Sequence, residues 1–366
     1  MSVTMTATMT ATMTAAMTAA MTATMTAAMT ATMTAAMTAA MTVTMTVTMK
    51  YSKAQAKEYA REHFRGVWAA TATPFDAQFR FDEAGFRSNL KHWIETLKLG
   101  GLFVCGKQGE FFSMSVAERK RSFELAVDAA RDKAGIVTSC SDTNLDVVLD
   151  LARHSQAIGA DYIVVHSPVL HFGRAIDDTV YEYYRYLSEQ VDIGIALWNH
   201  PDCGYEMSPE LCARIADLPN IVAIKYSVDR AKYARLTKIA GDRIIVSTAS
   251  EEEWFDNIVE LGWRLYLCST PPFTMQTALD QRINEYTALA FAGRVDEARK
   301  VRDSLNPVRA AFRNSRPKGT PQAHTKYWME QIGQVGGTVR RPLLALTEGE
   351  KAVIRKAVSE SGLKLV

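Results

Sequence analysis

The chain has 366 residues, of which 48% are hydrophobic and 22% are charged, so it can bury a sizeable core as one large domain or two ordinary ones. Its formal net charge is +2, with no basic stripe or acidic tail, which argues against nucleic acid as the main partner. The five cysteines are scattered and form no CxxC pair, which fits a reducing, cytoplasmic compartment and no structural zinc.

Residues 1–49 differ in kind from the rest. Met recurs at every fourth position from Met1 to Met49, usually followed by Thr, and no charge precedes Lys50. A four-residue period drifts around a helix, so it predicts no stable amphipathic face. The uncharged stretch formally permits a membrane span, but its many Thr residues and lack of Leu, Ile and Phe argue against one. We expect a low-complexity leader that is disordered, or an over-extended gene start with translation beginning at Met49, and no membrane partner.

From Gly66 onward, short apolar runs alternate with helix-length amphipathic segments. The runs predict strands buried on both faces, because a half-solvated strand would alternate polar and apolar residues. The predicted strands are Val67–Thr71, Leu102–Cys105, Ile136–Ser139, Tyr162–His166, Ile193–Trp198, Ile221–Lys225, Ile244–Ser247 and Arg264–Cys268.

Helices are predicted between these strands, several with capping signals such as Ser115 with Glu118, and Ser208 before Pro209. Their approximate spans are 82–98, 115–133, 143–158, 177–190, 208–217, 228–240, 251–261 and 272–292. Eight strand-then-helix units predict an α/β fold of the (β/α)8 TIM-barrel type. A doubly wound open sheet is the alternative, but no GxGxxG follows the first strand.

The end of the chain is predicted to be wholly helical, at about 294–314, 321–333 and 347–361. We therefore expect three regions: the leader at 1–49, the barrel at 50–293 and a C-terminal helical region at 294–366.

Lys225 ends the sixth predicted strand, Ile221–Lys225. Burial at the edge of a core disfavours the charged ammonium, and a neutral lysine is the nucleophile that forms a Schiff base with a carbonyl substrate. The alternative is a strand-end lysine whose amine reaches solvent.

The position of Lys225 in a barrel favours the nucleophile, because active sites of this fold lie at the C-terminal ends of the strands. Hydroxyls, amides and histidines gather at those ends. They include Thr73, Gln108, His166, Asn199, His200, Ser247 and Thr270.

Several short segments, four of them at these ends and one late in the chain, resemble the dihydrodipicolinate synthase and N-acetylneuraminate lyase superfamily, from about Gly66 to the C-terminus. They are Thr73-Pro74-Phe75, Gly106-Lys107-Gln108-Gly109-Glu110, Trp198-Asn199-His200-Pro201, Ile224-Lys225 and Arg340-Arg341-Pro342-Leu343. Within that superfamily, Glu110-Phe111-Phe112-Ser113-Met114 and Asn314-Ser315-Arg316-Pro317 are most similar to 5-dehydro-4-deoxyglucarate dehydratases. The resemblance implies a class I aldolase-type barrel whose lysine forms an imine with a 2-oxo acid such as pyruvate, in a homo-oligomer (tetramer or dimer).

The chain departs from that pattern around the lysine. Lys107 and Gln108 stand where the family has two hydroxyl residues, and Trp198 stands where it has a proton-shuttling tyrosine. The family's carboxylate-binding arginine falls near Cys203, and a second relay tyrosine falls near Leu170. These differences predict a divergent member that is not a true dihydrodipicolinate synthase.

Other residues can take over the missing roles. Lys107 would pair with the substrate carboxylate, and His200 and His171 are candidate proton shuttles because histidine titrates near neutral pH. For each, a loop side chain with no role in chemistry is the alternative, and we expect His166 to be a packed core histidine. We assign Lys225, His200 and Trp198 to catalysis. The expected substrate-binding residues are Lys107, Gln108, Thr73, Asn199, His171 and Ser247.

The leading hypothesis is a Schiff-base lyase, of aldolase or dehydratase type, acting on a 2-oxo acid without cofactor or metal. One alternative is a catalytically silent barrel that serves as a binding or regulatory protein. Another is an enzyme that uses Lys225 as a base without forming an imine.

Overall fold

The computed structural model describes residues 17–27, 29–30, 49–169, 175–248, 250–267 and 270–365, apart from the side chain of Asp202. The chain divides into two compact units, Met1–Val47 and Thr48–Val366. Each unit is described by itself.

In the first unit, residues 17–27 and 29–30 are helical and exposed. The hydroxyls of Thr22, Thr24 and Thr26 each donate to the carbonyl four residues earlier, at 2.8 Å. These bonds give the polar side chains a partner within the helix itself. That residues 1–49 form a disordered or untranslated leader stays a prediction. Across the described part of the chain, no helix combines the length and the apolar character that crossing a bilayer requires.

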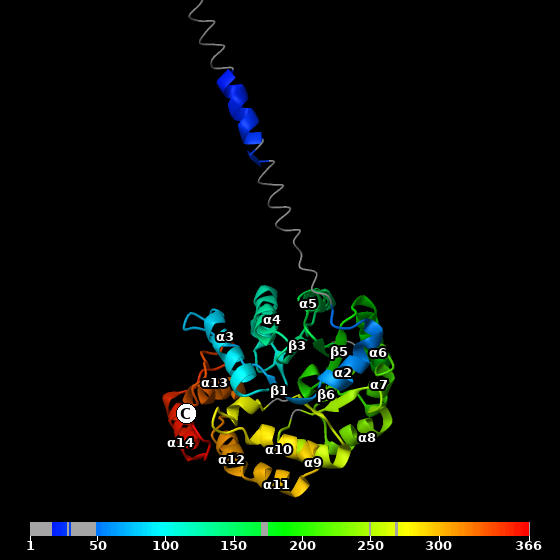
Figure 1. The fold of residues 1–366 in the computed structure, drawn as a ribbon, viewed down its shortest axis with the longest axis vertical. Helices are drawn as coiled ribbons and strands as arrows, with labels where there is room; N and C mark the ends of the chain where they lie inside the picture. Colours follow the sequence, from blue (N-terminus) through cyan, green and yellow to red (C-terminus); the bar gives the residue numbers. More distant parts are fainter. Residues whose placement is uncertain are drawn as a thin grey trace, which may run out of the picture. The chain divides into compact units, whose positions relative to one another are not determined.

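The second unit contains eight parallel strands, paired in the order β7-β6-β5-β4-β3-β2-β1-β8. Figure 1 shows them enclosed by a ring of helices. The strands are β1 (Gly66–Ala70), β2 (Gly101–Val104), β3 (Gly135–Ser139), β4 (Tyr162–His166), β5 (Gly194–Asn199), β6 (Ile221–Tyr226), β7 (Ile245–Ser247) and β8 (Leu265–Leu267). The predicted (β/α)8 barrel is confirmed, and nearly every strand residue is buried, as the apolar runs indicate.

The barrel closes between β7 and β8 through a side chain. The Ser247 hydroxyl, at the end of β7, accepts a hydrogen bond of 2.9 Å from the Leu267 N–H of β8. Ser247 is fully buried, so its hydroxyl stands in for a backbone carbonyl at this position.

The helices of the barrel follow the predicted alternation. They are α3 (Glu83–Lys91) with η2 (His92–Thr96), α4 (Val116–Ala130), α5 (Leu145–Ala157), α6 (Ile176–Gln190), α7 (Pro209–Ile215), α8 (Arg230–Ala240), α9 (Trp254–Leu261) and α10 (Arg282–Phe291). The capping box of Ser115 and Glu118 is present at the start of α4. The predicted helix over 272–292 is wrong in its first half. That half holds only the short η5 (Pro272–Thr274) and a turn over Thr277–Asp280, where Pro271 and Pro272 cannot supply the N–H groups of a helix interior.

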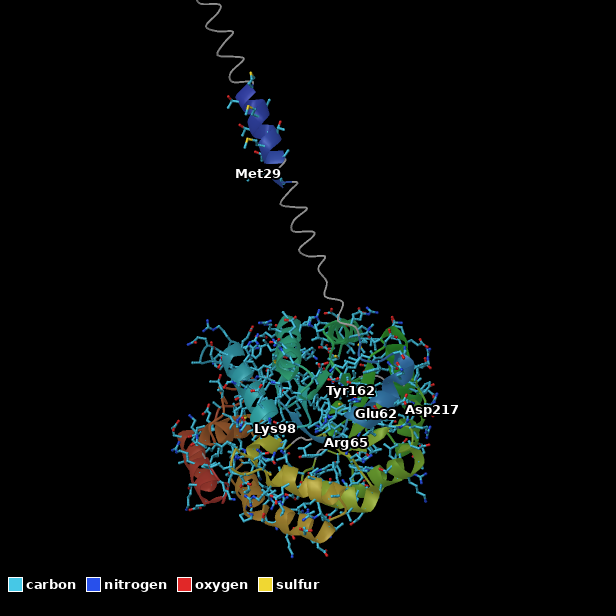
Figure 2. All side chains as sticks on the ribbon, viewed as in Figure 1. Met29, Glu62, Arg65, Lys98, Tyr162 and Asp217 are labelled. Atoms are coloured by element: carbon cyan, nitrogen blue, oxygen red, sulfur yellow. The ribbon has the colours of Figure 1, made fainter. Side chains whose placement is uncertain are left out.

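The segment before β1 was not predicted to be structured. It forms η1 (Lys53–Gln55) and α2 (Ala56–His63), which packs on β5 and β6. Phe64, directly after α2, stacks on Tyr162 of β4 with ring centroids 4.4 Å apart. Tyr162, labelled in Figure 2, therefore lies at the end of the barrel where the strands begin.

Tyr51 links this segment to two strands of the barrel. Its hydroxyl donates to the Asp161 carbonyl and accepts from the Gly194 N–H at 2.9 Å. We expect Tyr51→Phe to lower the free energy of unfolding by about 1–3 kcal/mol, because two buried backbone groups lose their partner. Denaturant unfolding measures this loss, with Tyr186→Phe, at an exposed tyrosine, as the control. Equal stability of both variants would contradict the expectation.

The C-terminal helices are α11 (Val295–Asp303), α12 (Asn306–Asn314), α13 (Pro321–Gln331) and α14 (Glu348–Glu360). They pack against the barrel, with α13 near α3 (Figure 1). Two buried bonds fix them: the Trp328 indole donates to the Thr274 carbonyl at 2.8 Å, and the Gln334 amide donates to the Phe273 carbonyl at 2.7 Å. The predicted helical extension is confirmed, whereas the boundary at residue 293 stays a prediction.

Candidate active site

Four side chains lie level with one another at the C-terminal ends of adjacent strands. The register pairs His166 of β4 with Trp198 of β5, Trp198 with Lys225 of β6, and Lys225 with Ser247 of β7. Register partners on neighbouring strands project to the same side of a sheet. The row therefore brings three predicted site residues together with His166.

Lys225 is 3% exposed and lies among aromatic rings. Its Nζ is 5.0 Å from the Phe103 ring centroid and 5.6 Å from that of Trp198. The two rings meet edge to face at 5.6 Å. The prediction of a lysine buried at the mouth of the barrel is thus matched by the geometry, and the alternative of an amine that reaches bulk solvent is not.

A cavity of about 440 Å³ opens beside this row. Trp198 and His166 line it, and the Trp198 ring centroid also lies 5.6 Å from the Lys225 nitrogen. Lys107, a predicted substrate-binding residue, and His200, a predicted catalytic residue, also line it, and their roles stay predictions. Apolar lining comes from Phe111, Phe112, Met114 and Val169, and the remaining lining residues are Asp142, Thr143 and Cys203.

His166 is buried, as predicted, but it also borders the cavity. Its Nδ1 lies 2.6 Å from the Ser167 carbonyl oxygen. A carbonyl only accepts, so this bond assigns the proton to Nδ1 and leaves Nε2 with a free lone pair. Burial, the largest cause, lowers the pKa of His166 below the usual histidine value. At neutral pH the ring is therefore a neutral base facing the site.

Arg119 of α4 fixes the loop that follows β3. Its buried guanidinium donates to the Ser139 and Ser141 carbonyls at 2.9 and 2.8 Å and to the Asp142 carboxylate at 3.1 Å. Its Cζ also lies 5.5 Å from the Phe111 ring centroid. One buried cation thus positions two elements of the cavity wall.

The loop after β2 carries Lys107 and Gln108 and packs closely on the end of β1. A Cβ at Gly109 would lie 3.0 Å from the Cys105 Cα and 3.1 Å from the Thr73 Oγ1, so only glycine fits without displacing the loop. Cys105 and Glu110, on either side of Lys107 and Gln108, have left-handed backbones with φ of 59° and 57°. Such conformations persist only where the surroundings hold them.

Those surroundings come from α13 and the chain after it. Glu110 is fully buried, and its carboxylate pairs with the Lys326 amine at 2.5 Å and accepts from the Arg340 N–H at 3.0 Å. The Gln322 amide donates to the Lys107 carbonyl at 3.2 Å. The C-terminal helices therefore hold the loop that carries two predicted substrate-binding residues.

A second cavity of about 470 Å³ shares Lys107 and His200 with the first. Gln108 lines this second cavity together with Gln322 and the segment that joins α12 to α13.

The remaining predicted residues differ in their surroundings. Thr73 is buried beside the loop after β2, and its hydroxyl has no hydrogen-bond partner among the described residues. The Asn199 side-chain oxygen accepts from the Met207 N–H at 2.9 Å. Ser247 closes the barrel through its hydroxyl, which gives it a structural role in addition to its place beside Lys225. His171 lies outside the described residues.

Buried polar atoms without a described hydrogen-bond partner concentrate at this end of the barrel. Native proteins satisfy most buried polar groups, so such atoms mark places where a ligand or water bonds. At the strand ends they are Thr73 Oγ1, Ser139 Oγ, Ser167 Oγ, Trp198 Nε1, Asn199 Nδ2 and Ser227 Oγ. The Trp198 indole is thus a buried donor with no described acceptor, on a residue that lines the cavity.

Sequence reasoning missed His166 and Arg119 as parts of the site. His166 ends a run that is apolar on both faces, so no alternation indicates which way its side chain points. Arg119 looks like an ordinary polar helix residue. Only the position of α4 against the loop after β3 shows its function.

An eight-stranded parallel barrel with a buried lysine at the end of β6, next to a tryptophan that lines a polar and aromatic cavity, defines a lysine-containing (β/α)8 enzyme scaffold. Residues 63–361 match the model of the dihydrodipicolinate synthetase family. The chain belongs to this family, whose members are lyases.

The chain matches curated relatives over nearly their whole length. The chain is 27% identical over 301 residues to a 4-hydroxy-tetrahydrodipicolinate synthase of Methanothrix thermoacetophila, covering 81% of this chain and 97% of the relative. It is 28% identical over 308 residues to the 4-hydroxy-tetrahydrodipicolinate synthase of Syntrophus aciditrophicus, covering 82% and 99%.

Solved structures share the fold at lower identity. YagE, a prophage protein of E. coli K12 solved in complex with pyruvate, is 22% identical with a TM-score of 0.73, over 82% of this chain and 99% of YagE. CdNal of Clostridium difficile, solved with mannosamine, is 23% identical with a TM-score of 0.71, over 81% and 99%. These likenesses show the fold.

Proposed function

We propose that this protein is a Schiff-base lyase, of aldolase or dehydratase type, in which Lys225 forms an imine with a 2-oxo acid. The observation that carries the proposal is the Lys225 amine, 3% exposed, beside the aromatic wall of a cavity at the C-terminal mouth of the barrel. An amine in such surroundings loses hydration that would otherwise stabilise its charged form, which favours attack on a carbonyl carbon.

The proposed chemistry balances with water as the only small product of imine formation. The Lys225 nitrogen bonds to C2 of the 2-oxo acid, and the oxo oxygen leaves as water after protonation. The resulting iminium withdraws electrons from C3, so that a C3 proton can leave and an enamine forms. Cleavage, condensation or loss of a hydroxyl can then proceed from the iminium–enamine pair.

Protein groups around Lys225 support these steps. Lys107 lines the cavity and would attract the substrate carboxylate, and the Trp198 indole, which has no described acceptor, would donate to an oxygen of the bound acid. His166 and His200 are both candidates to move the C3 proton, with His166 in register with Trp198 and neutral at working pH.

We further propose that the substrate differs from that of the 4-hydroxy-tetrahydrodipicolinate synthases. The support is local: Trp198 stands in place of the family's tyrosine, and Lys107-Gln108 stand in place of its two hydroxyl residues. An indole donates a hydrogen bond but cannot relay a proton as a phenol does. We also propose a homo-oligomer, either a tetramer or a dimer.

Borohydride trapping tests the imine directly. The protein is incubated with pyruvate, 2-oxobutanoate or 2-oxoglutarate, reduced with sodium borohydride and analysed by peptide mass spectrometry. We expect at least one acid to add its reduced mass to the peptide that contains Lys225. Borohydride without acid is the control, and an unmodified Lys225 with every acid would refute the proposal.

A catalytically silent barrel is the second candidate function. The replacement of the phenol by the Trp198 indole favours it, because the change removes a group that such chemistry uses. Labelling with pyruvate but no exchange of its methyl protons for deuterium would favour a binding protein, whereas exchange establishes enamine formation.

The acid limb of the pH–rate profile for that exchange, where the rate falls at low pH, tests the role of His166. If its Nε2 removes the C3 proton, protonation of the ring stops exchange, and the lowered pKa places this loss below about pH 6.5. We expect His166→Gln to slow exchange by about 10²–10⁴-fold and to abolish this limb. Proton NMR in deuterated water measures the rate, with His200→Gln in parallel. A limb that survives in His166→Gln and vanishes in His200→Gln would assign the role to His200.

A further inference from the structure

The second cavity has cationic walls. Besides Lys107, three basic side chains line it: Arg313 at the end of α12, and Arg316 and Lys318 in the segment before α13. No acidic side chain is among its lining residues. Four cations around one hollow of about 470 Å³ attract an anion strongly, because their fields add within a concave surface.

The pairing of these cations differs. Arg313 is bonded to the Glu252 carboxylate at 2.8 Å. Within the described part of the chain, Arg316 and Lys318 belong to no ion pair, and both are exposed. An anion that enters this cavity can therefore contact these two cations without displacing a described carboxylate.

The start of α13 adds to the same field. Pro321 and Gln322, at the first positions of this 11-residue helix, line the cavity, and the first turn of α13 contains no acidic residue. The positive end of a helix dipole favours a nearby anion.

The position of the cavity links it to the candidate active site. Lys107 and His200 line both cavities, so the two hollows adjoin at these side chains. A molecule held at Lys225 by its 2-oxo end can extend past Lys107 and His200 toward Arg316 and Lys318.

We propose that the segment 313–322 forms a second anion subsite, and that the substrate is a 2-oxo acid with another anionic group at the end remote from its oxo carbon. This inference rests on the proposed function, because it takes the 2-oxo end to be bound at Lys225. The subsite recognises charge at the far end, and the apolar wall of the first cavity accommodates the carbon chain between the two ends.

Matched pairs of 2-oxo acids test this subsite. 2-Oxoglutarate, 2-oxoadipate and 2-oxopimelate each carry a second carboxylate, and 2-oxopentanoate, 2-oxohexanoate and 2-oxoheptanoate are the corresponding monoacids. The measurement is the acid concentration that gives half-maximal borohydride labelling of Lys225. We expect at least one diacid to label at a concentration about tenfold or more below that of its monoacid, because charge-assisted bonds of this kind are strong.

The variant Arg316→Gln/Lys318→Gln removes the two unpaired cations without touching a buried group. We expect the preference for the diacid to fall to about twofold or less, and to weaken in the wild type as salt is raised. Lys356→Gln, at an exposed lysine of α14 away from both cavities, is the matched control and keeps the preference.

The outcomes separate the two proposals. No labelling by pyruvate or by any acid in the wild type refutes imine formation at Lys225. Labelling in which every diacid and its monoacid are equally effective refutes the anion subsite while the Schiff-base function stands. A preference that persists unchanged in the double variant also refutes the subsite, because the distal anion is then bound elsewhere.

Discussion

Lys225→Met is expected to abolish the exchange of pyruvate methyl protons, with a loss of at least about a thousandfold. A methionine retains the length and apolar stem of the side chain but has no amine, so no iminium can form. General-base removal of the C3 proton without the iminium meets a far weaker acid. The size of the expected loss reflects removal of the covalent intermediate itself.

The fold should tolerate this change. Lys225 lies between Phe103 and Trp198, and a methionine sulfur packs well against aromatic rings. We expect the circular dichroism spectrum and the unfolding midpoint of Lys225→Met to stay close to those of the wild type, because methionine keeps the apolar stem and its contacts with the two rings. If exchange is lost while the fold stays intact, the loss is therefore due to the missing amine and not to unfolding.

Lys107→Met is the matched control for that experiment. It removes a cation that lines the cavity but leaves the Lys225 amine in place. We expect it to raise the pyruvate concentration needed for half-maximal exchange, with Lys225 still labelled by borohydride. Exchange that survives in Lys225→Met would eliminate the imine mechanism and favour a base reaction without a covalent intermediate.

The sequence allows the barrel to be predicted because each strand is a short apolar run bounded by turn residues. Ile221–Lys225 illustrates this: the run, its length and its terminal lysine are all local signals, and the structure places β6 within one residue of that span. Once the strands are known, the C-terminal ends follow from chain direction. The position of Lys225 could therefore be predicted from the sequence.

The direction in which the side chains at those strand ends point could not be predicted from the sequence. His166 and Trp198 share one level of the barrel because the register aligns β4 with β5. A strand that is apolar on both faces carries no alternation to show this. The strand register likewise sets Ser247 beside Lys225. Its hydroxyl closes the barrel by accepting a hydrogen bond from the Leu267 N–H of β8, a strand distant in the sequence.

Contacts between distant parts of the chain were also beyond prediction. Tyr51 bonds to Asp161, and Glu110 pairs with Lys326, across separations that leave no periodic trace in the sequence. The first contact fixes the segment before β1 at one end of the barrel. The second fixes the loop after β2 at the end where the candidate site lies.

Glu110→Leu is expected to lower the free energy of unfolding by about 3–5 kcal/mol, the usual cost of leaving one member of a buried ion pair alone. Glu110 and Lys326 are 0% and 1% exposed, so water cannot replace the lost partner. The carboxylate also accepts from the Arg340 N–H, which adds a second unsatisfied group. Denaturant unfolding at neutral pH measures the loss, and proton exchange of pyruvate should fall with it because the loop carrying Lys107 loses its anchor.

A double-mutant cycle separates the pair from its surroundings. Lys326→Met alone leaves the Glu110 carboxylate buried without its cation, so we expect a similar loss. Glu110→Leu/Lys326→Met replaces both charges with apolar groups, and we expect it to be markedly more stable than the sum of the single losses predicts. Additive losses would show that the two side chains do not interact.

The dependence of the Glu110→Leu loss on pH provides an independent check through Lys326. Burial lowers the pKa of Lys326 to about 8, and Glu110 opposes that shift, so the variant should lower the pKa further. The unfolded chain holds its proton up to about pH 10.4, so between the two pKa values it binds more protons than the folded chain. Stability of the variant therefore rises with pH in this window. The wild type rises with the same slope only above its own Lys326 pKa of about 8, so the gap between variant and wild type should narrow as the pH rises to about 8 and stay constant above it. A gap that instead widens above about pH 8 would mean that the lone Lys326 amine gains access to water once Glu110 is removed, because its pKa then returns to the value of the unfolded chain.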